Sequence, residues 1–224
     1  MTLKIGIIDS GKGGQYFGYQ LQKVLKKEVE LFAYKAFYFE SYGTVSKQRL
    51  FCMCDSHLDY LIDKCDVDII VVACMTLSTN CLEYIKQRAK DIPVYDLYTS
   101  LPYLDDNTVV FATENTINSG RFDYCRTLPT ASLASYIQTF TNDQFEFEDK
   151  KTSEKMVKGL INAALWSKSI EAERSIIVLG CSHYPIVTDI FEKYLKPAYI
   201  VDPIYFCIES LREETLLHNY FKGE

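Results

Sequence analysis

Residues 67–74, VDIIVVAC, contain an unbroken apolar run that ends in a cysteine, and a cluster of hydroxyl side chains follows in residues 75–80, MTLSTN. A continuous apolar run of this length is typical of a strand that is buried on both faces of a parallel sheet. A second stretch, SIIVLGCSHYP at residues 175–185, repeats the arrangement of apolar strand, small residue, cysteine and hydroxyl. The two stretches indicate two similar halves, each with a cysteine at the end of a strand.

Short apolar strands alternate with longer helical patterns along the rest of the chain. This alternation predicts an α/β protein with parallel sheets, because parallel strands are usually joined by crossover helices. In that class, ligands bind at the carboxyl ends of the strands. Further strands are expected at residues 4–10, 31–37, 92–97, 108–113 and 198–203, and helices at residues 18–27, 47–64, 79–90, about 130–140 and 153–170.

The composition narrows the choice of partner and compartment. A net charge of −6 and a pI near 5.2, without a basic stripe, argue against a nucleic-acid partner and favour a small-molecule substrate. The apolar part of the N-terminus is short and breaks at Asp9, so neither a signal sequence nor a membrane span is expected. Eight cysteines without an export signal predict reduced thiols and a cytoplasmic protein.

Four potential metal ligands, Cys52, Cys54, His57 and Cys65, lie close together in the sequence. Their spacing does not match the paired C-x2-C pattern of structural zinc sites, so no metal is predicted. The segment has the periodicity of a helix, and its thiols are expected to pack as small hydrophobic side chains. His57 has no motif around it and is expected on the surface or on a helix face.

Three strand ends carry polar or reactive side chains: Asp9 and Ser10, then Cys74 and Thr76, then Cys181, Ser182 and His183. Inverting the stereocentre of an amino acid requires one group that removes the Cα proton and another, on the opposite face, that returns one. Two cysteines suit this reaction, because a thiol with a pKa near about 8.5 can act as a base in one direction and an acid in the other. His183 could assist Cys181, and Asp9 could assist or orient Cys74.

Five segments resemble the motifs of the cofactor-independent glutamate racemases, which belong to the aspartate/glutamate racemase family. IGIIDSGKGG (5–14) is similar to their D-S-G-x-G-G motif, VVACMT (71–76) to A-C-N-T, and GCSHYP (180–185) to G-C-T-H-Y-P. ESYGTVS (40–46) is similar to their P-Y-G segment and FATENTINSG (111–120) to A-T-x-x-T-x-x-S. The matches follow the order of the family and cover most of the chain, so together they are specific.

The resemblance implies two similar parallel-sheet α/β domains with the active site between them. The first domain is expected to span residues 1–95 plus about 200–224, and the second residues 96–199. Cys74 and Cys181 would be the paired acid and base, supported by Asp9 and His183, without pyridoxal phosphate or any other cofactor. The residues expected to contact the amino-acid substrate are Ser10, Ser41, Tyr42, Gly43, Met75, Thr76, Thr113, Thr116 and Ser182.

The resulting hypothesis is a racemase that interconverts L- and D-glutamate, as in the supply of D-amino acids for peptidoglycan, and that pairs as a homodimer. Three positions depart from the family pattern. Ser41 replaces a proline, Ser132 stands near an expected acidic residue, and Met75 replaces an asparagine. A thioether cannot donate the hydrogen bond that the asparagine would give to the head of the amino acid. Two alternatives therefore stay open, a racemase or isomerase of another amino acid such as aspartate, and a non-catalytic protein that binds a ligand.

Overall fold

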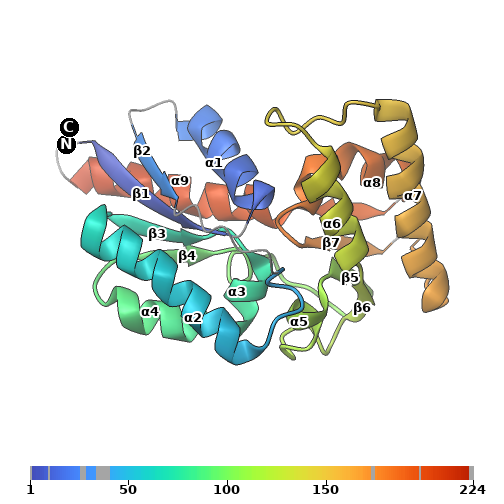
Figure 1. Ribbon diagram of the computed structural model, residues 1–224, viewed down its shortest axis with the longest axis horizontal. Coiled ribbons are helices and arrows are strands. Elements are labelled where there is room, and N and C mark those ends of the chain that lie inside the picture. Colours follow the sequence, from blue (N-terminus) through green and yellow to red (C-terminus); the bar gives the residue numbers. More distant parts are fainter. Residues whose placement is uncertain are drawn as a thin grey trace.

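The computed structural model describes residues 2–9, 11–25, 29–33, 41–172, 175–196 and 198–221, with side chains up to residue 213. The described residues form two four-stranded parallel sheets, one in each half of Figure 1. The order in the first sheet is β2 (Val29–Ala33), β1 (Leu3–Ile8), β3 (Ile69–Val72), β4 (Val94–Asp96). The order in the second sheet is β6 (Arg126–Pro129), β5 (Thr108–Ala112), β7 (Ile176–Gly180), β8 (Tyr199–Val201). The α/β class with two similar parallel sheets is confirmed.

The two sheets have the same strand order, so β3 and β7 are both third from the equivalent edge. The central strands are apolar without alternation. Every residue of β5 is buried, and in β3 and β7 only the first residue is partly exposed. Continuous burial is expected where helices cover both faces of a parallel sheet.

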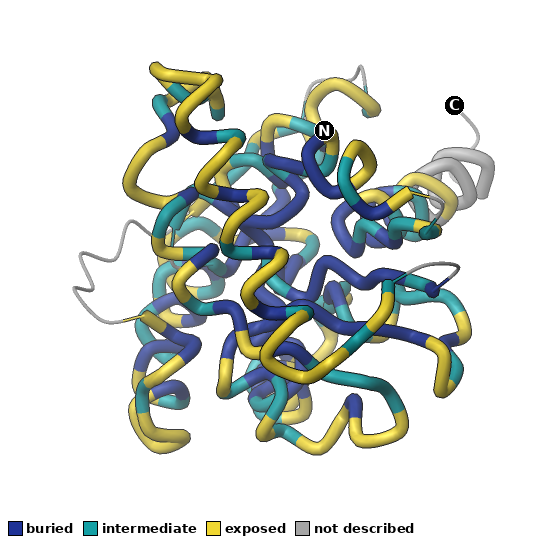
Figure 2. Tube along the Cα trace, turned by 90° about the vertical axis from the view of Figure 1, so that its right-hand side faces the viewer, coloured by how far each residue is buried: buried dark blue, intermediate teal, exposed yellow. Residues whose placement is uncertain are grey.

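Helices cover the outer face of each sheet. In the first half, α2 (Lys47–Leu58) and α4 (Leu82–Ala89) pack through Leu50, Met53 and Ile85. In the second half, an equivalent apolar cluster lies beneath three helices, α6 (Ala131–Phe140), α7 (Lys150–Ser167) and α8 (Thr188–Tyr194). Figure 2 shows the buried segments inside the molecule and the exposed ones on these outer helices.

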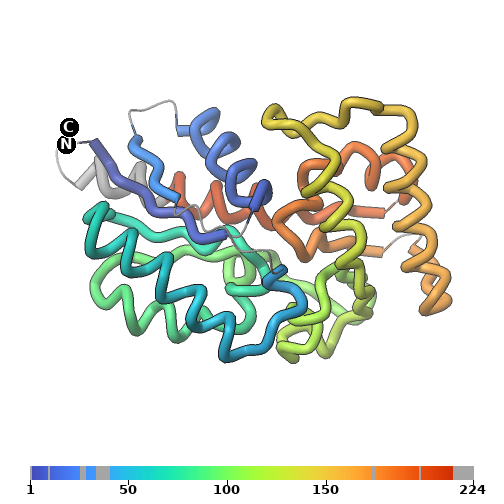
Figure 3. The backbone as a smooth tube through the Cα atoms, in the orientation of Figure 1, coloured from blue at the N-terminus to red at the C-terminus, as the bar shows by residue number. Residues whose placement is uncertain are grey.

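A third apolar cluster joins the two halves, with Ile7 from the first sheet and Val110 and Val178 from the second. It includes residues of α1 (Lys12–Leu25) and of the C-terminal α9 (Pro203–Phe221), which lies beside α1 (Figure 3). Because α9 contacts α1 and β4 in the first half and β7 in the second, the division of the chain into two domains stays a prediction. No helix in the described ranges has both the length and the apolar character to cross a membrane.

The structure differs from the sequence prediction mainly in short elements. The helix expected over residues 47–64 is α2 followed by a π-helix, η1 (Asp59–Lys64). The strand expected at residues 31–37 begins earlier, at Val29, and residues 34–37 lie outside the described residues. The elements that the sequence did not predict are β6, α3 (Met75–Asn80), α5 (Glu114–Ile117), η2 (Tyr184–Val187), α8 and α9. Three of these, α3, α5 and η2, are too short to show helical periodicity.

Candidate active site

The predicted strand ends meet where the two halves face each other. Asp9 follows β1, and Cys74 and Cys181 follow the equivalent strands β3 and β7. Ser182 Oγ of the second half donates a hydrogen bond to Asp9 Oδ2 of the first half at 3.4 Å. The charge of Asp9 acts on the pKa of both Cys74 and Cys181. The structure therefore brings these two thiols and this carboxylate together. Ser10 lies outside the described residues.

The glycine motif lets the start of α1 fit between Asp9 and the second half. The backbone N–H of Gly14 donates to Asp9 Oδ2. A Cβ on Gly14 would lie 2.5 Å from Asp9 Cβ, and one on Gly13 would lie 2.2 Å from Ser182 Oγ. A side chain at Gly13 would push the halves apart, and one at Gly14 would displace Asp9 within the first half. The motif thus has a packing role at the site, and its last two glycines lie in α1, which begins at Lys12 and not at the expected residue 18.

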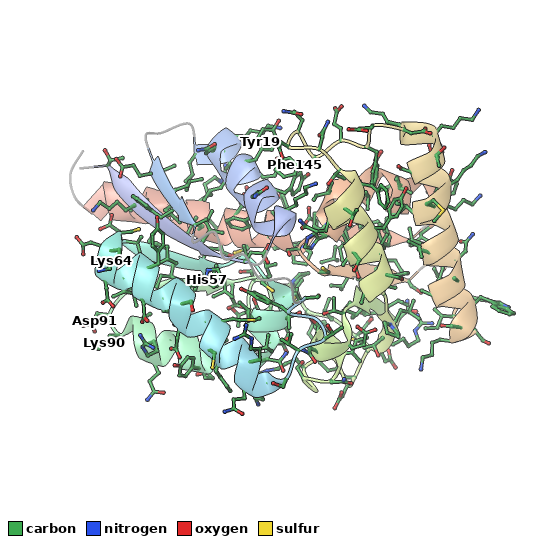
Figure 4. All side chains as sticks on the ribbon, in the orientation of Figure 1. Tyr19, His57, Lys64, Lys90, Asp91 and Phe145 are labelled. Carbon is green, nitrogen blue, oxygen red and sulfur yellow. The ribbon has the colours of Figure 1, made fainter. Side chains whose placement is uncertain are left out.

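Aromatic contacts hold the same junction from outside the site. The ring of Phe145, in the turn that follows α6, lies 5.2 Å from the ring of Tyr16 and 5.7 Å from that of Tyr19 on α1. Figure 4 shows Phe145 next to Tyr19 where the two halves meet. Lys12 Nζ also donates to the carbonyl of Thr141 in this turn. The start of α1 is thus fixed to the second half by apolar and polar contacts.

Cys181 lies against the imidazole of His183. The distance from Cys181 Sγ to His183 Nδ1 is 3.6 Å. Burial raises the pKa of the Cys181 thiol to about 12; a backbone hydrogen bond at His183 lowers it, and the charge of Asp9 raises it further. Burial and then the cation of Lys12 lower the pKa of His183 to about 4. The pair is therefore a neutral thiol beside a neutral imidazole.

Cys74 is buried at the start of α3. Burial raises the pKa of its thiol well above the ordinary value, and the negative charges of Asp9 and Cys181 act in the same direction. Backbone N–H groups of Leu77 and Thr76 lower it. These N–H groups would stabilise a thiolate at Cys74, because they donate hydrogen bonds to the charged form.

Three threonine hydroxyls form a triangle across the junction. Thr76 Oγ1 lies 3.0 Å from both Thr113 Oγ1 and Thr116 Oγ1, and the last two lie 3.2 Å apart. All three residues are buried, with Thr76 on α3 and the other two at α5. The structure thus brings together three of the predicted substrate-binding residues. A hydroxyl can turn its hydrogen toward a new acceptor, so the triangle can offer donors to a carboxylate.

The turn that contains Ser41, Tyr42 and Gly43 packs on α5. Asn115 of α5 donates from its side chain to the carbonyls of Tyr42 at 2.8 Å and Val45 at 2.7 Å, and its backbone N–H donates to Gly43 at 2.9 Å. A Cβ on Gly43 would lie 2.6 Å from that of Thr113. Ser41 is exposed, and its Oγ accepts a hydrogen bond from the N–H of Gly43 at 3.3 Å. The backbone of this turn is therefore held against the threonine triangle.

Tyr42 points into the first half, where its hydroxyl lies 2.7 Å from His57 Nε2. Both residues are buried, and Figure 4 shows His57, near the end of α2, inside the first half. Burial lowers the pKa of His57 to about 4. His57 therefore lies on a helix face, one of the two places expected for it, but this is the buried face of α2 and not the surface, because its imidazole has a buried phenol as a partner from a distant part of the chain.

Met75 and Ser132 show how this chain departs from the family pattern. Met75 is 1% exposed and packs in the apolar cluster between the sheets. Ser132 is exposed on α6.

Two residues to which the sequence analysis gave no role, Lys12 and Gln138, act on His183. The charge of Lys12 lowers the pKa of His183, and Gln138 Oε1 lies 2.7 Å from His183 Nε2. Gln138 stands in an ordinary helical stretch, so no local signal identified it.

The cysteine-rich segment forms no metal site in the structure. Across the described part of the chain, no group of three or more His, Cys, Asp or Glu side chains is arranged to hold a metal ion. Cys54 is buried in the core and Cys52 is exposed, so the two side chains point to different surroundings.

Two parallel sheets of the same strand order, each with a cysteine after its third strand, form an α/β fold that matches the structures of glutamate racemases. The chain is a homologue of the glutamate racemases, at about 25% identity over nearly its full length. The glutamate racemase of Lactococcus lactis is 25% identical over 226 residues, which cover 97% of this chain and 80% of that protein. A structure of glutamate racemase from Francisella tularensis in complex with D-glutamate matches with a TM-score of 0.76 at 25% identity, covering 97% of this chain and 82% of that one. No family model matches the chain.

The same fold also occurs in a racemase that is named for a different compound. Allantoin racemase from Klebsiella pneumoniae matches with a TM-score of 0.60 at 13% identity, covering 97% of this chain and 89% of that one. At this identity the likeness concerns the fold alone. The fold therefore does not name the substrate, which has to be argued from the site.

Proposed function

We propose that the chain is an amino-acid racemase that interconverts L- and D-glutamate without a cofactor. The observation that carries this proposal is the arrangement of Cys74 and Cys181 at equivalent strand ends, both within electrostatic reach of Asp9. A substrate between the thiols would lose its Cα proton on one face and gain a proton on the other. The relatives named as glutamate racemases, one of them solved with D-glutamate, support glutamate as the substrate.

The proposed cycle begins at Cys181, because its raised pKa keeps it a thiol before the substrate reacts. The Sγ–H bond breaks and the proton moves to Nδ1 of His183, 3.6 Å away, which leaves a thiolate and an imidazolium. The thiolate removes the Cα proton, and Cys74 gives its own proton to the opposite face of the carbanion. The N–H groups of Thr76 and Leu77 then stabilise the Cys74 thiolate. After the product leaves, the His183 imidazolium gives its proton to solvent and the Cys74 thiolate takes one up, which restores the starting protonation. The reverse reaction uses the same groups in the opposite order.

The threonine triangle and Ser182 are the proposed carboxylate contacts. Thr76, Thr113 and Thr116 already hydrogen-bond one another, so a carboxylate would replace these bonds without leaving a hydroxyl unsatisfied. The backbone of Tyr42 and Gly43 would form the wall beside them. Ser10 and Ser41 stay in the proposed set on the family resemblance. A cytoplasmic role in peptidoglycan synthesis and a homodimer rest on the same resemblance.

Met75 favours a second candidate, a racemase of another amino acid such as aspartate. Its thioether is buried among apolar side chains and cannot donate a hydrogen bond to the substrate. A protein without this donor would bind the amino-acid head through other groups, and its preference among acidic amino acids would change accordingly.

Proton NMR in D2O tests these candidates directly. Purified protein is incubated with L-glutamate, L-aspartate and a panel of other L-amino acids, and loss of the Cα proton signal is followed together with chiral analysis. Exchange and D-glutamate formation are the expected result. Exchange with aspartate alone would establish the second candidate. A ligand that raises the melting temperature without any exchange would contradict both and indicate a binding protein, because such a ligand stabilises the folded state by mass action.

A further inference from the structure

Gln138 of α6 contacts two groups at the site through one atom. Its Oε1 lies 2.9 Å from the backbone N of Lys12 and 2.7 Å from His183 Nε2. Gly11 leaves the space for this oxygen, since a Cβ there would lie 2.4 Å from it. A single side-chain oxygen therefore joins the start of α1, in the first half, to the imidazole of the second half.

These contacts determine where the hydrogen of His183 lies. A backbone N–H is only a donor, so the atom of Gln138 that faces Lys12 has to be the carbonyl oxygen and not the amide nitrogen. The same oxygen faces Nε2 of His183, which must carry a hydrogen to bond it. A neutral imidazole has one N–H, so Nδ1 is an acceptor, and its neighbour is Cys181 Sγ at 3.6 Å.

We propose that Gln138 is a positioning residue that holds neutral His183 in its Nε2–H tautomer and leaves Nδ1 ready to receive the Cys181 proton. The catalytic consequence rests on the proposed racemase function, whereas the tautomer is a property of the resting protein. His183 is neutral near pH 7, because burial and the charge of Lys12 lower its pKa to about 4. The titratable groups that act on this thiol–imidazole pair are Lys12 on α1, which acts on His183, and Asp9, Cys74 and Tyr184, which interact with Cys181.

The position of Gln138 makes it suitable for substitution. The residue is exposed, so Gln138→Leu leaves no cavity in the core. Gln138→Glu keeps an acceptor oxygen toward Lys12 and His183 but adds a negative charge. Ser135, also exposed and one turn earlier on α6, gives the matched control Ser135→Ala. Circular dichroism of each variant checks that the fold is unchanged.

The tautomer is measured by NMR, without any turnover. The protein has three histidines, and in histidine labelled with nitrogen-15 the two ring nitrogens have different shifts according to which carries hydrogen. The signals of His183 are identified by their loss in His183→Asn. We expect the Nε2–H form in the natural protein and in Ser135→Ala, and loss of this single form in Gln138→Leu. An Nδ1–H form in the natural protein, or an unchanged spectrum in Gln138→Leu, would overturn the proposal.

Kinetics supply the second readout. Gln138→Leu should lower kcat about tenfold or more while KM changes less than about twofold, because a histidine in the wrong tautomer cannot take the proton. Gln138→Glu should keep the Nε2–H form and move the acid limb of the pH profile to higher pH, since a carboxylate favours the imidazolium. A natural protein that exchanges no amino acid contradicts the proposed function, and the NMR result still decides on Gln138. An active racemase whose Gln138→Leu variant keeps both tautomer and pH profile overturns the role of Gln138 alone.

Discussion

The ends of β3 and β7 occupy equivalent places in two sheets of the same order, yet they give their cysteines different surroundings. After Cys74 the chain enters α3 directly, and backbone N–H groups of Thr76 and Leu77 act on its sulfur. After Cys181 a short turn brings the imidazole of His183 against the sulfur, in addition to the backbone N–H of the same residue. Both thiols thus have amide donors, and Cys181 also has a proton acceptor beside it.

This difference shows that the position of each sulfur and its proton exchange depend on different parts of the fold. The repeated sheets determine where the two sulfurs lie, and the few residues after each strand determine how each sulfur exchanges its proton. Asp9 is common to both ends, because its charge raises the pKa of both thiols. The difference between the two ends is therefore the imidazole of His183, which lies against Cys181 and adds a proton acceptor to the backbone N–H donors that act on both thiols.

The largest expected effect comes from removing either thiol. Cys74→Ser and Cys181→Ser should each lower kcat by about 10³-fold or more, because a serine hydroxyl is a much weaker acid than a thiol and positioned acid–base groups contribute up to about 10⁴-fold. Cα proton exchange in D2O measures the loss. Cys52→Ser, at an exposed position of α2, is the control and should keep full activity. Near-full turnover in either of the first two variants would end the two-thiol proposal.

The second-largest effect is expected from Gly13→Ala, which tests how closely the two halves must approach each other at the site. Gly13→Ala would place a Cβ 2.2 Å from Ser182 Oγ and 2.8 Å from the Ser182 carbonyl carbon, so the halves have to move apart. A movement of the halves by about 1 Å should lower kcat about 100-fold, because acid–base groups act only at close range. Steady-state kinetics measure it, and unfolding in urea shows whether the fold survives. Unchanged kinetics would mean that the two halves can shift without cost to the site.

A third prediction compares the buried histidines of the two halves. Burial lowers the pKa of both His57 and His183 to about 4. In the unfolded chain a histidine has a pKa near about 6.5, so between these values the unfolded state binds more protons than the folded one. Both residues therefore destabilise the fold as the pH falls from about 6.5 toward 4. Asp202 opposes this between its unfolded value and its raised pKa of about 6, because there the folded state binds the extra proton.

His57→Phe isolates the contribution of the first half, since His183 and Asp202 titrate alike in both proteins. The free energy of unfolding in urea should fall less for the variant than for the natural protein between pH 6.5 and pH 5, by about 2 kcal/mol. The variant also loses the hydrogen bond to Tyr42, which lowers its stability at every pH. An equal pH dependence in both proteins would show that His57 is not buried as a neutral imidazole.

The sequence predicted the two strands and their cysteines better than the side-chain contacts that distinguish the two strand ends. The continuous apolar runs before Cys74 and Cys181 identified both strands, since only strands buried on both faces read this way. The glycine motif after the first strand drew attention to Asp9, and the motif that contains Cys181 drew attention to His183. Gln138 and His57 were missed because their partners, Lys12 and Tyr42, come from other elements. The periodicity of apolar residues predicts helices and strands, but it does not predict a contact between one side chain and a distant part of the chain.

The smallest expected effect comes from a glycine outside the site. It distinguishes the steric effect of an added Cβ, as at Gly13, from the effect of lower backbone entropy. Gly159 lies in the middle of α7, and a Cβ there would meet nothing within 4 Å, in contrast to Gly13. Gly159→Ala should raise the free energy of unfolding by about 0.5–1 kcal/mol, because glycine loses more backbone entropy than alanine when it enters a helix. Unfolding in urea measures the gain, and kcat should not change. If Gly159→Ala lowered kcat as Gly13→Ala does, the loss at Gly13 could no longer be assigned to the junction between the halves, because an alanine on an outer helix would have the same effect.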